Sequence, residues 1–218
     1  MSEASGNAAT LLVDAHIAAT EGNQRALAYR DKHYTFHDLA ALVNRAGNML
    51  RSLGVERGAR AMILLPPSPV WFGTMLGAIK LGAVPIVTAE TPNVETIRAA
   101  CGRHQPALAI VDGTRLGEWR GALGATRIVV AGEPQGGAPS LVELLRAAPS
   151  SLAAEAVADS APALIVLGAD GETSADHAAL TRAAGGKPSL AMRVAELDLS
   201  AALAALAACR EVTIPAAS

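Results

Sequence analysis

Short apolar runs alternate along the middle of the chain with segments whose apolar residues recur every three or four positions. Continuous apolar runs are typical of strands buried on both faces of a sheet, and the longer spacing is typical of amphipathic helices. The pattern predicts strands at 61–65, 83–87, 107–111, 127–130 and 164–167, and helices at 39–53, 70–81, 94–103 and 141–147. This order predicts a three-layer α/β fold, in which a mostly parallel sheet is flanked by helices.

Residues that favour helix ends support these boundaries. Thr35, with Asp38 three positions later, predicts a capping box, and Gly54 fits the left-handed residue that follows a helix. Ser68, followed by proline, predicts the start of the next helix, and Gly82 predicts its end.

Shorter elements are predicted towards both ends of the chain. A helix at 10–19 and a hairpin around 30–32 precede the strands and helices described above, and an alanine-rich helix at 199–209 leads to an apolar run at 211–214. We predict a single α/β domain over 1–218, made of an N-terminal part, a doubly wound βαβ core and a divergent C-terminal part at 1–60, 61–180 and 181–218.

Composition and charge limit the partners. The 218 residues are 51% hydrophobic and carry a formal net charge of −2, without a cluster of basic residues. No nucleic acid and no membrane is therefore expected as a partner. No apolar run approaches the length of a membrane span, and the first residues do not resemble a signal peptide, which together predict a cytoplasmic protein.

Isolated cysteines, histidines and aromatic residues are expected to be structural. Cys101 and Cys209 lack metal-binding spacing, so both are predicted to be reduced, buried thiols. Trp71 and Phe72 are predicted to pack in the core instead of lining a ligand pocket. Four histidines without a partner pattern are predicted to be surface or capping residues: His16, His33, His37 and His104.

The segment 161–177 carries the main functional signal. Its apolar strand runs into a turn where a phosphate-binding loop would be expected, yet Asp170, Glu172 and Asp176 place carboxylates there. A phosphate loop needs close backbone N–H groups, hydroxyls and usually a lysine. The next lysine is Lys187, and fixed negative charges repel phosphate.

Three more specific functional interpretations of this region stay open. Asp170, Glu172, Asp176 and His177 supply ligand types that a hard metal prefers, but an acidic loop in solvent is the favoured interpretation, because spacing alone does not constrain ligand geometry. His177 would serve as a general base only beside a nucleophile such as Ser174 or Thr173, and is otherwise expected to be an exposed loop histidine. Lys187 after two glycines fits an anion site at the start of the next helix, but a plain turn is the favoured interpretation.

Five segments in the first half of the chain carry a family resemblance. They read Arg25-Ala-Leu-Ala-Tyr-Arg, Tyr34-Thr-Phe-His-Asp-Leu, Asn44-Arg-Ala-Gly-Asn-Met-Leu-Arg-Ser-Leu-Gly-Val, Gly58-Ala-Arg-Ala-Met-Ile-Leu-Leu-Pro-Pro-Ser-Pro and Phe72-Gly-Thr-Met-Leu-Gly-Ala-Ile-Lys-Leu-Gly-Ala-Val-Pro. Together they resemble the N-terminal part of the adenylate-forming superfamily, with the closest likeness to acyl-CoA and benzoate-CoA ligases. The likeness covers about the first 110 residues, with a looser match to roughly residue 180.

The resemblance implies a Ser/Thr/Gly-rich phosphate loop ending in Pro-Lys after the strand at 164–167. Only Gly171, Thr173 and Ser174 suit nucleotide binding at that position, and no register restores the lysine. An alignment of Gly186-Lys-Pro-Ser189 with the end of that loop replaces the lysine with serine and has no apolar strand before it. The family's second subdomain and mobile C-terminal domain would lie beyond Ser218.

These departures predict a non-catalytic, truncated acyl-CoA-synthetase-like protein that acts as a binding or interaction module. No cofactor is expected, because ATP and CoA would bind only if the family activity survives. The resemblance implies a protein partner or a homo-oligomer, through the face that packs on the second subdomain in the family. The alternatives are a residual nucleotide or acyl binder, one half of a split acyl-CoA ligase, and a decayed reading frame.

Overall fold

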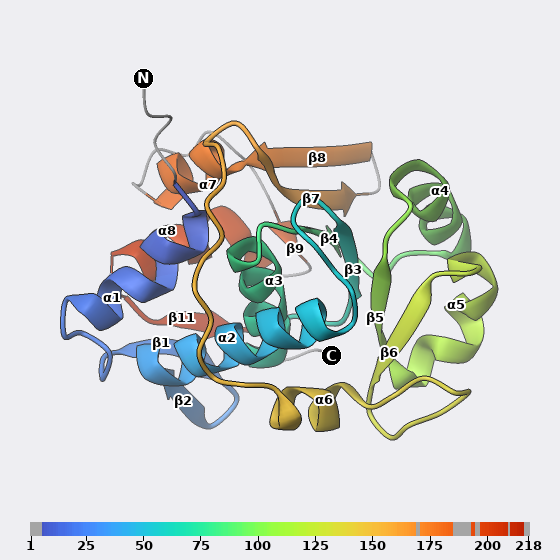
Figure 1. Cartoon of the computed structure of the whole chain (residues 1–218), viewed down its shortest axis with the longest axis horizontal. Coiled ribbons are helices and arrows are strands. Elements are labelled where there is room, and N and C mark those ends of the chain that lie inside the picture. The colour runs from blue at the N-terminus through green and yellow to red at the C-terminus, as the bar shows by residue number, and fades with distance from the viewer. Residues whose placement is uncertain (1–5, 169–170, 185–192, 195–196, 209, 216–218) are drawn as a thin grey trace.

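The computed structural model of the chain describes residues 6–168, 171–184, 193–194, 197–208 and 210–215. A six-stranded sheet with the order β6-β5-β3-β4-β7-β8 lies at its centre (Figure 1). Its strands are β3 (Arg60–Leu64), β4 (Val84–Thr88), β5 (Leu108–Asp112), β6 (Arg127–Ala131), β7 (Pro162–Gly168) and β8 (Gly171–Asp176). All neighbours pair in parallel except β8, which is antiparallel to β7. The predicted α/β class and mostly parallel sheet are confirmed.

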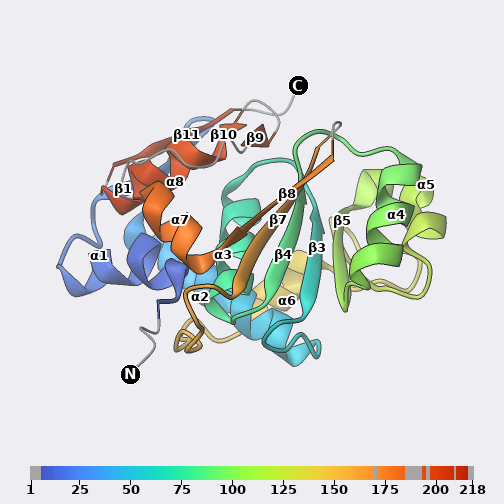
Figure 2. The same cartoon turned by 90° about the horizontal axis from the view of Figure 1, so that it is seen from above.

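Helices cover both faces of this sheet. They are α2 (Phe36–Ser52), α3 (Pro69–Lys80) and α6 (Leu141–Ala147) on one face, and α4 (Val94–His104) and α5 (Leu116–Leu123) on the other, with the short helix η2 (Gly113–Arg115) before α5. Within β3, Ala61 and Ile63 join the core under α2 and α3, whereas Met62 and Leu64 join the core under α4 and α5. Figure 2 shows α4 and α5 together on one side of the strands. This alternation explains why the strands are apolar throughout.

The predicted helix ends are confirmed. The Thr35 hydroxyl accepts a hydrogen bond from the Asp38 N–H at 3.2 Å, and an Asp38 carboxylate oxygen accepts from the Thr35 N–H at 2.9 Å. The Ser68 hydroxyl accepts from a backbone N–H in the first turn of α3 at 3.1 Å. Gly54 and Gly82 follow their helices with φ of 82° and 72°, which glycine adopts without steric cost.

A second, smaller sheet joins the two ends of the chain. In it β1 (Arg25–Tyr29) pairs antiparallel with β2 (Lys32–Thr35) and parallel with β11 (Val212–Ile214). The remaining elements are η1 (Thr10–Asp14), α1 (Ala15–Ala18), α7 (His177–Ala184), β9 (Arg193–Val194), β10 (Leu197–Asp198) and α8 (Leu199–Ala207). Leu203 and Leu206 of α8 are buried in the same core as Leu12 of η1, so the C-terminal elements cover the N-terminal ones.

Several elements differ from the sequence-based expectation, and α7, β9 and β10 are among those that were not predicted. Helix α5 was not predicted, because Gly117 and Gly121 lower its helix propensity; it is held by the burial of Leu116 and Trp119. The segment expected to be an acidic turn after the strand at 164–167 is instead strand β8. None of the helices in the described ranges is long and apolar enough to cross a membrane.

Glycines allow α2 and α3 to approach each other closely. A Cβ placed on Gly77 would lie 2.7 Å from the Val43 carbonyl oxygen and 2.8 Å from the Gly47 nitrogen, which are backbone atoms of α2. We expect Gly77→Ala to lower the free energy of unfolding by about 2 kcal/mol, because the two helices must move apart. A Cβ on Gly121 of α5 would meet nothing within 4 Å.

Gly121→Ala is therefore the matched control for chemical denaturation. We expect it to raise the free energy of unfolding by about 0.5–1 kcal/mol, because alanine favours the helix. Equal effects of the two substitutions would contradict the close approach of α2 and α3.

Candidate functional site

The predicted phosphate-loop position lies where β7 leads into β8. Gly168 pairs with Gly171 and Leu167 pairs with Glu172, so the two strands are in register up to their connection. Only Ala169 and Asp170 separate the paired glycines in sequence, and both lie outside the described residues. Two residues between the paired glycines are too few for a Ser/Thr/Gly-rich loop ending in Pro-Lys.

The hydroxyl residues expected to replace such a loop lie on the strand itself. Thr173 pairs with Val166 and Ser174 pairs with Ile165, and both side chains are exposed. Neighbouring residues of a strand project to opposite faces of the sheet, so the two hydroxyls diverge. Gly171, with φ of 134°, adopts a backbone conformation that favours glycine. Nucleotide binding by Gly171, Thr173 and Ser174 stays a prediction.

Two acidic residues of this segment, Glu172 and Asp176, interact with other groups of the chain. A Glu172 carboxylate oxygen lies 3.1 Å from Arg103 Nη1 and 2.7 Å from His104 Nε2, at the C-terminal end of α4. An Asp176 oxygen accepts a hydrogen bond from the Ala179 N–H at 2.6 Å in the first turn of α7. The expectation of a loop is therefore wrong for these two residues, which lie on β8, whereas Glu172 is exposed to solvent as expected.

The open metal interpretation gains no geometric support within the described part of the chain. No group of three or more His, Cys, Asp or Glu side chains there is close enough together to hold a metal ion. Asp170, which the metal interpretation also used, lies outside the described residues.

His177 is buried, so the expectation of an exposed loop histidine is wrong. It is 0% exposed at the start of α7, and its Nδ1 accepts a hydrogen bond from the Ala8 N–H at 3.1 Å. The neutral ring therefore carries its proton on Nε2, which is buried without a hydrogen-bond partner among the described residues. Because the Ala8 N–H already donates to Nδ1, the neutral ring has no free nitrogen that could accept a proton from a nucleophile. His16, 5% exposed and 2.8 Å from Glu21, is likewise buried rather than on the surface.

Burial lowers the pKa of His177 below 6.5, and the nearby carboxylates of Asp159 and Asp176 oppose this shift only in part. Because the unfolded state binds a proton more readily, stability is fully present above the unfolded pKa of about 6.5 and falls as the pH drops below it. The protonated ring also loses the acceptor for the Ala8 N–H. We expect the free energy of unfolding to decrease between pH 7 and 5, by at most about 1.4 kcal/mol per pH unit from this group.

Denaturation curves of His177→Asn measure that contribution. The asparagine offers an oxygen acceptor to the Ala8 N–H but does not titrate, so the loss of stability below pH 7 should shrink. His37→Gln, which removes an exposed histidine, is the matched control. A pH dependence that is the same in both variants would contradict the assignment to His177.

The chain offers few lysines to a phosphate. Its three lysines are Lys32, Lys80 and Lys187. Lys32 begins β2, and the Lys80 side chain is 3% exposed, with its Nζ 2.6 Å from Asp14 Oδ1 and 2.8 Å from Asn44 Oδ1. Lys187, for which an anion site and a plain turn were considered, lies outside the described residues. No described lysine is therefore available at the β7–β8 connection.

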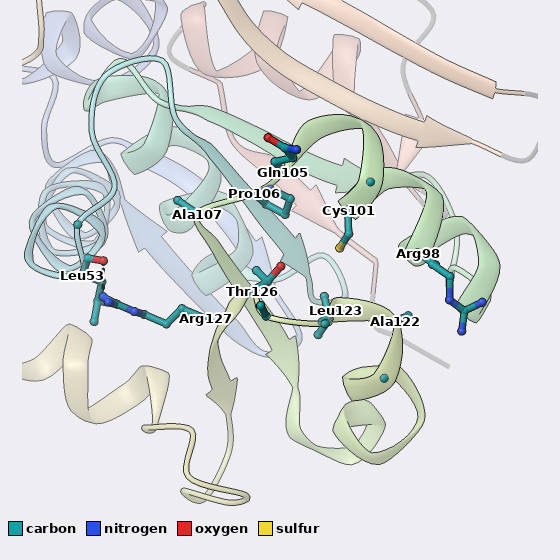
Figure 3. A pocket seen from close by; sticks show the side chains of 15 residues that line it. Leu53, Arg98, Cys101, Gln105, Pro106, Ala107, Ala122, Leu123, Thr126 and Arg127 are labelled. Carbon is teal, nitrogen blue, oxygen red and sulfur yellow. Dashed lines mark hydrogen bonds between the residues drawn. The ribbon is translucent and has the colours of Figure 1, made fainter.

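A hollow of about 830 Å³ lies between α4, α5 and the first residues of β5 and β6 (Figure 3). Its labelled side chains include Arg98, Cys101, Thr126 and Arg127. Arg98 is in an ion pair with Glu95, and Arg127 donates to the Leu53 carbonyl oxygen at the end of α2. No carboxylate or histidine lines the hollow, so it holds no acid–base pair.

Cys101 is a partly buried, free thiol in this hollow. Burial raises the pKa of the Cys101 thiol above 9.0, and a hydrogen bond with Thr126 offsets part of that rise. The group is therefore protonated at neutral pH and is a weak nucleophile. The prediction of a reduced thiol is consistent with this environment, whereas Cys209 lies outside the described residues. The sequence signal for the hollow was limited to its glycines at 54, 102, 121 and 124.

Sequence relatives of the chain include CoA ligases and synthetases. It is 46% identical over 83 residues to the acetyl-coenzyme A synthetase of Bacillus subtilis strain 168, a match that covers 36% of this chain and 14% of the relative. It is 28% identical over 156 residues to the 3-hydroxybenzoate–CoA ligase of Aromatoleum sp. strain CIB, covering 70% of this chain and 30% of the relative. The chain thus matches less than a third of the length of these relatives.

Solved structures with a similar fold include two aryl-CoA ligases. The anthranilate CoA ligase AuaEII, in complex with anthranoyl-AMP, superposes with a TM-score of 0.73 and 26% identity, covering 82% of this chain and 36% of that one. A benzoate CoA ligase from Burkholderia xenovorans LB400 gives a TM-score of 0.71 at 24% identity, covering 84% and 37%. The observed fold is therefore that of the N-terminal part of acyl- and aryl-CoA ligases.

Residues 14–192 match the sequence profile of the AMP-binding enzyme family, which is more than half of the chain. This match spans the whole six-stranded sheet and its helices. The chain therefore belongs to the AMP-binding enzyme family.

Proposed function

We propose that this chain is a non-catalytic, acyl-CoA-ligase-like module that works by binding another protein chain. The observation that carries the proposal is the β7–β8 hairpin at the position of the phosphate loop. Its strands are paired up to Gly168 and Gly171, and Glu172 is held by two basic side chains of α4. This arrangement favours a structural role for the segment over nucleotide binding.

The energetics of acyl adenylation support the same proposal. The reaction must stabilise negative charge that develops around the α-phosphate, and it must hold the carboxylate in line with phosphorus. Loss of a single electrostatic donor typically raises the barrier by about 3 kcal/mol. At the β7–β8 connection the described residues supply no lysine, and the hydroxyls of Thr173 and Ser174 lie on opposite faces of the strand. Among the described residues at this connection, several donors are therefore missing together.

Carboxylate-dependent exchange of pyrophosphate into ATP tests the catalytic part of the proposal. Acetate, benzoate, 3-hydroxybenzoate and anthranilate are the acids to supply, because the names of the relatives contain them. We expect no exchange above that of an enzyme-free control with any of the four acids. Exchange that depends on one of the acids and saturates with it would overturn the proposal.

The surface for another chain is proposed to be the free edge of β8. Strand β8 ends the six-stranded sheet, and within the described residues its outer edge pairs with no other strand. Open edges present backbone N–H and C=O groups that pair with a strand of another chain. The only large apolar side chains classed as exposed among these residues are Leu11 and Val142, so an apolar patch is a weaker candidate.

Light scattering after size-exclusion chromatography tests this surface for a second copy of the chain. We expect a concentration-dependent mass approaching twice 22.1 kDa. Ser174→Lys adds a charge at the edge and should shift the chain towards the monomer, whereas Val142→Lys on α6 should not. A monomer at all concentrations, or a dimer that Ser174→Lys leaves intact, would contradict pairing of two copies through β8.

A further inference from the structure

A second hollow, of about 610 Å³, lies where β3, β4 and β7 begin. This place is separate from the β7–β8 connection, which follows the end of β7. Its lining consists of two arginines together with glycine, proline and small apolar residues: Arg57, Gly58, Arg60, Gly82, Val84, Ala156, Val157, Ala158, Ala161 and Pro162. The volume is in the range of small-molecule sites.

The charge of this lining is positive. Arg57 and Arg60 are its only charged residues, and neither forms an ion pair with a described residue. Arg57 Nη1 donates to the Ala156 carbonyl oxygen at 3.2 Å, and Arg60 Nη1 donates to the Gly58 carbonyl oxygen at 3.4 Å. A guanidinium has five N–H donors, so each arginine keeps donors for a ligand.

Backbone hydrogen bonds fix the walls of the hollow. The Gly58 N–H donates to the Gly82 carbonyl oxygen at 2.8 Å, and the Ala161 N–H donates to the Ala158 carbonyl oxygen at 2.9 Å. Gly82 has φ of 72°, and a Cβ there would lie 2.9 Å from Arg57 Cγ. The stem of Arg57 therefore lies directly over Gly82.

The nearest acidic residues in sequence are Glu56, Glu155 and Asp159, and none of them lines the hollow. Glu56, next to Arg57, is exposed. Glu155 lies 3.4 Å from Arg51, on the side of α2. Asp159 lies against Gly6 and acts electrostatically on His177. The lining therefore combines two exposed arginines with the apolar residues Val84, Val157 and Pro162, and it contains no carboxylate of a described residue.

We propose that this hollow binds a small organic carboxylate. The guanidinium groups of Arg57 and Arg60 hold the carboxylate, because their planar forks match its geometry. The apolar walls receive the carbon body of the ligand, which distinguishes an organic acid from inorganic phosphate. This site is independent of the proposed interaction through β8 and of any nucleotide at the β7–β8 connection.

Titration of the whole chain with benzoate, followed by backbone amide NMR shifts, tests the proposal. We expect saturable shifts at Gly58, Gly82 and Ala158, with a Kd of about 1 mM or lower. Inorganic phosphate is the second probe and should bind at least about tenfold more weakly, because it leaves the apolar walls uncovered. Arg57→Gln combined with Arg60→Gln should weaken benzoate binding at least about tenfold, since charge-assisted hydrogen bonds are lost.

Two further variants keep the test decisive if the double variant folds poorly. Ala158→Glu retains both arginines but adds a carboxylate to the lining, and it should also weaken benzoate binding about tenfold. Arg146→Gln makes the same charge change on α6, outside the lining, and should leave the Kd unchanged. Absence of saturable shifts at 10 mM benzoate, shifts confined to other amides, equal binding of phosphate, or equal losses in Arg146→Gln would each overturn the proposal.

Discussion

Replacement of Trp71 by alanine should lower the free energy of unfolding by about 4 kcal/mol. Trp71 is fully buried in α3, and its ring meets that of Phe72 edge-on with centroids 5.1 Å apart. Helix α3 is buried around most of its circumference, so surrounding residues have little freedom to fill the space left by the indole. Chemical denaturation followed by circular dichroism measures the loss.

Two substitutions calibrate that value. Trp71→Phe retains an aromatic ring and should cost clearly less than Trp71→Ala, partly because it removes an indole N–H that has no partner among the described residues. Val142→Ala, at a side chain that is 49% exposed, should stay within about 0.5 kcal/mol. A loss below about 1 kcal/mol for Trp71→Ala would favour a ligand pocket at this position over core packing.

Lys80→Met should be the second most damaging change, with a loss of about 3 kcal/mol. The Lys80 ammonium joins Asp14 of η1 to Asn44 of α2, at 2.6 and 2.8 Å. Removing the charge leaves the Asp14 carboxylate, 31% exposed, without its cation. Breaking a buried pair on one side costs more than replacing both partners, because the remaining charge stays desolvated.

A double-variant cycle isolates this pair. Asp14→Asn combined with Lys80→Met should lose less than the sum of the two single variants, because the second change no longer leaves an unpaired charge. Lys32→Met, at an exposed lysine of β2, controls for the loss of one positive charge and should change stability by less than about 0.5 kcal/mol. Additive losses in the cycle would show that Lys80 acts through its methylene groups alone.

Much of the fold could be predicted because its signals are local. The capping box at Thr35, the proline after Ser68 and the glycines at 54 and 82 mark the observed helix ends. Helix α5 could not be predicted, because its glycines oppose it and its burial against the sheet depends on distant residues. The parallel pairing of β11 with β1 joins positions at opposite ends of the chain, which periodicity does not encode.

The candidate site, like the fold, could be predicted from the sequence only in part. The absence of a lysine near the strand at 164–167 is a property of the sequence and holds for the described structure. The strand character of β8 was missed, because its polar residues are typical of a loop and their pairing with β7 depends on the hairpin. The burial of His177 depends on Ala8, which is distant in sequence. The sequence alone does not show which distant backbone group a polar side chain contacts.

Calorimetric titration of the chain with ATP and magnesium tests the central claim most directly. The claim is that the β7–β8 hairpin cannot hold the phosphates of a nucleotide, since it lacks both the loop and its lysine. We predict no measurable heat of binding at ATP concentrations up to about 5 mM, where sites with a Kd of about 1 mM would be detected. Saturable binding of ATP that Thr173→Ala or Ser174→Ala weakens would contradict the account.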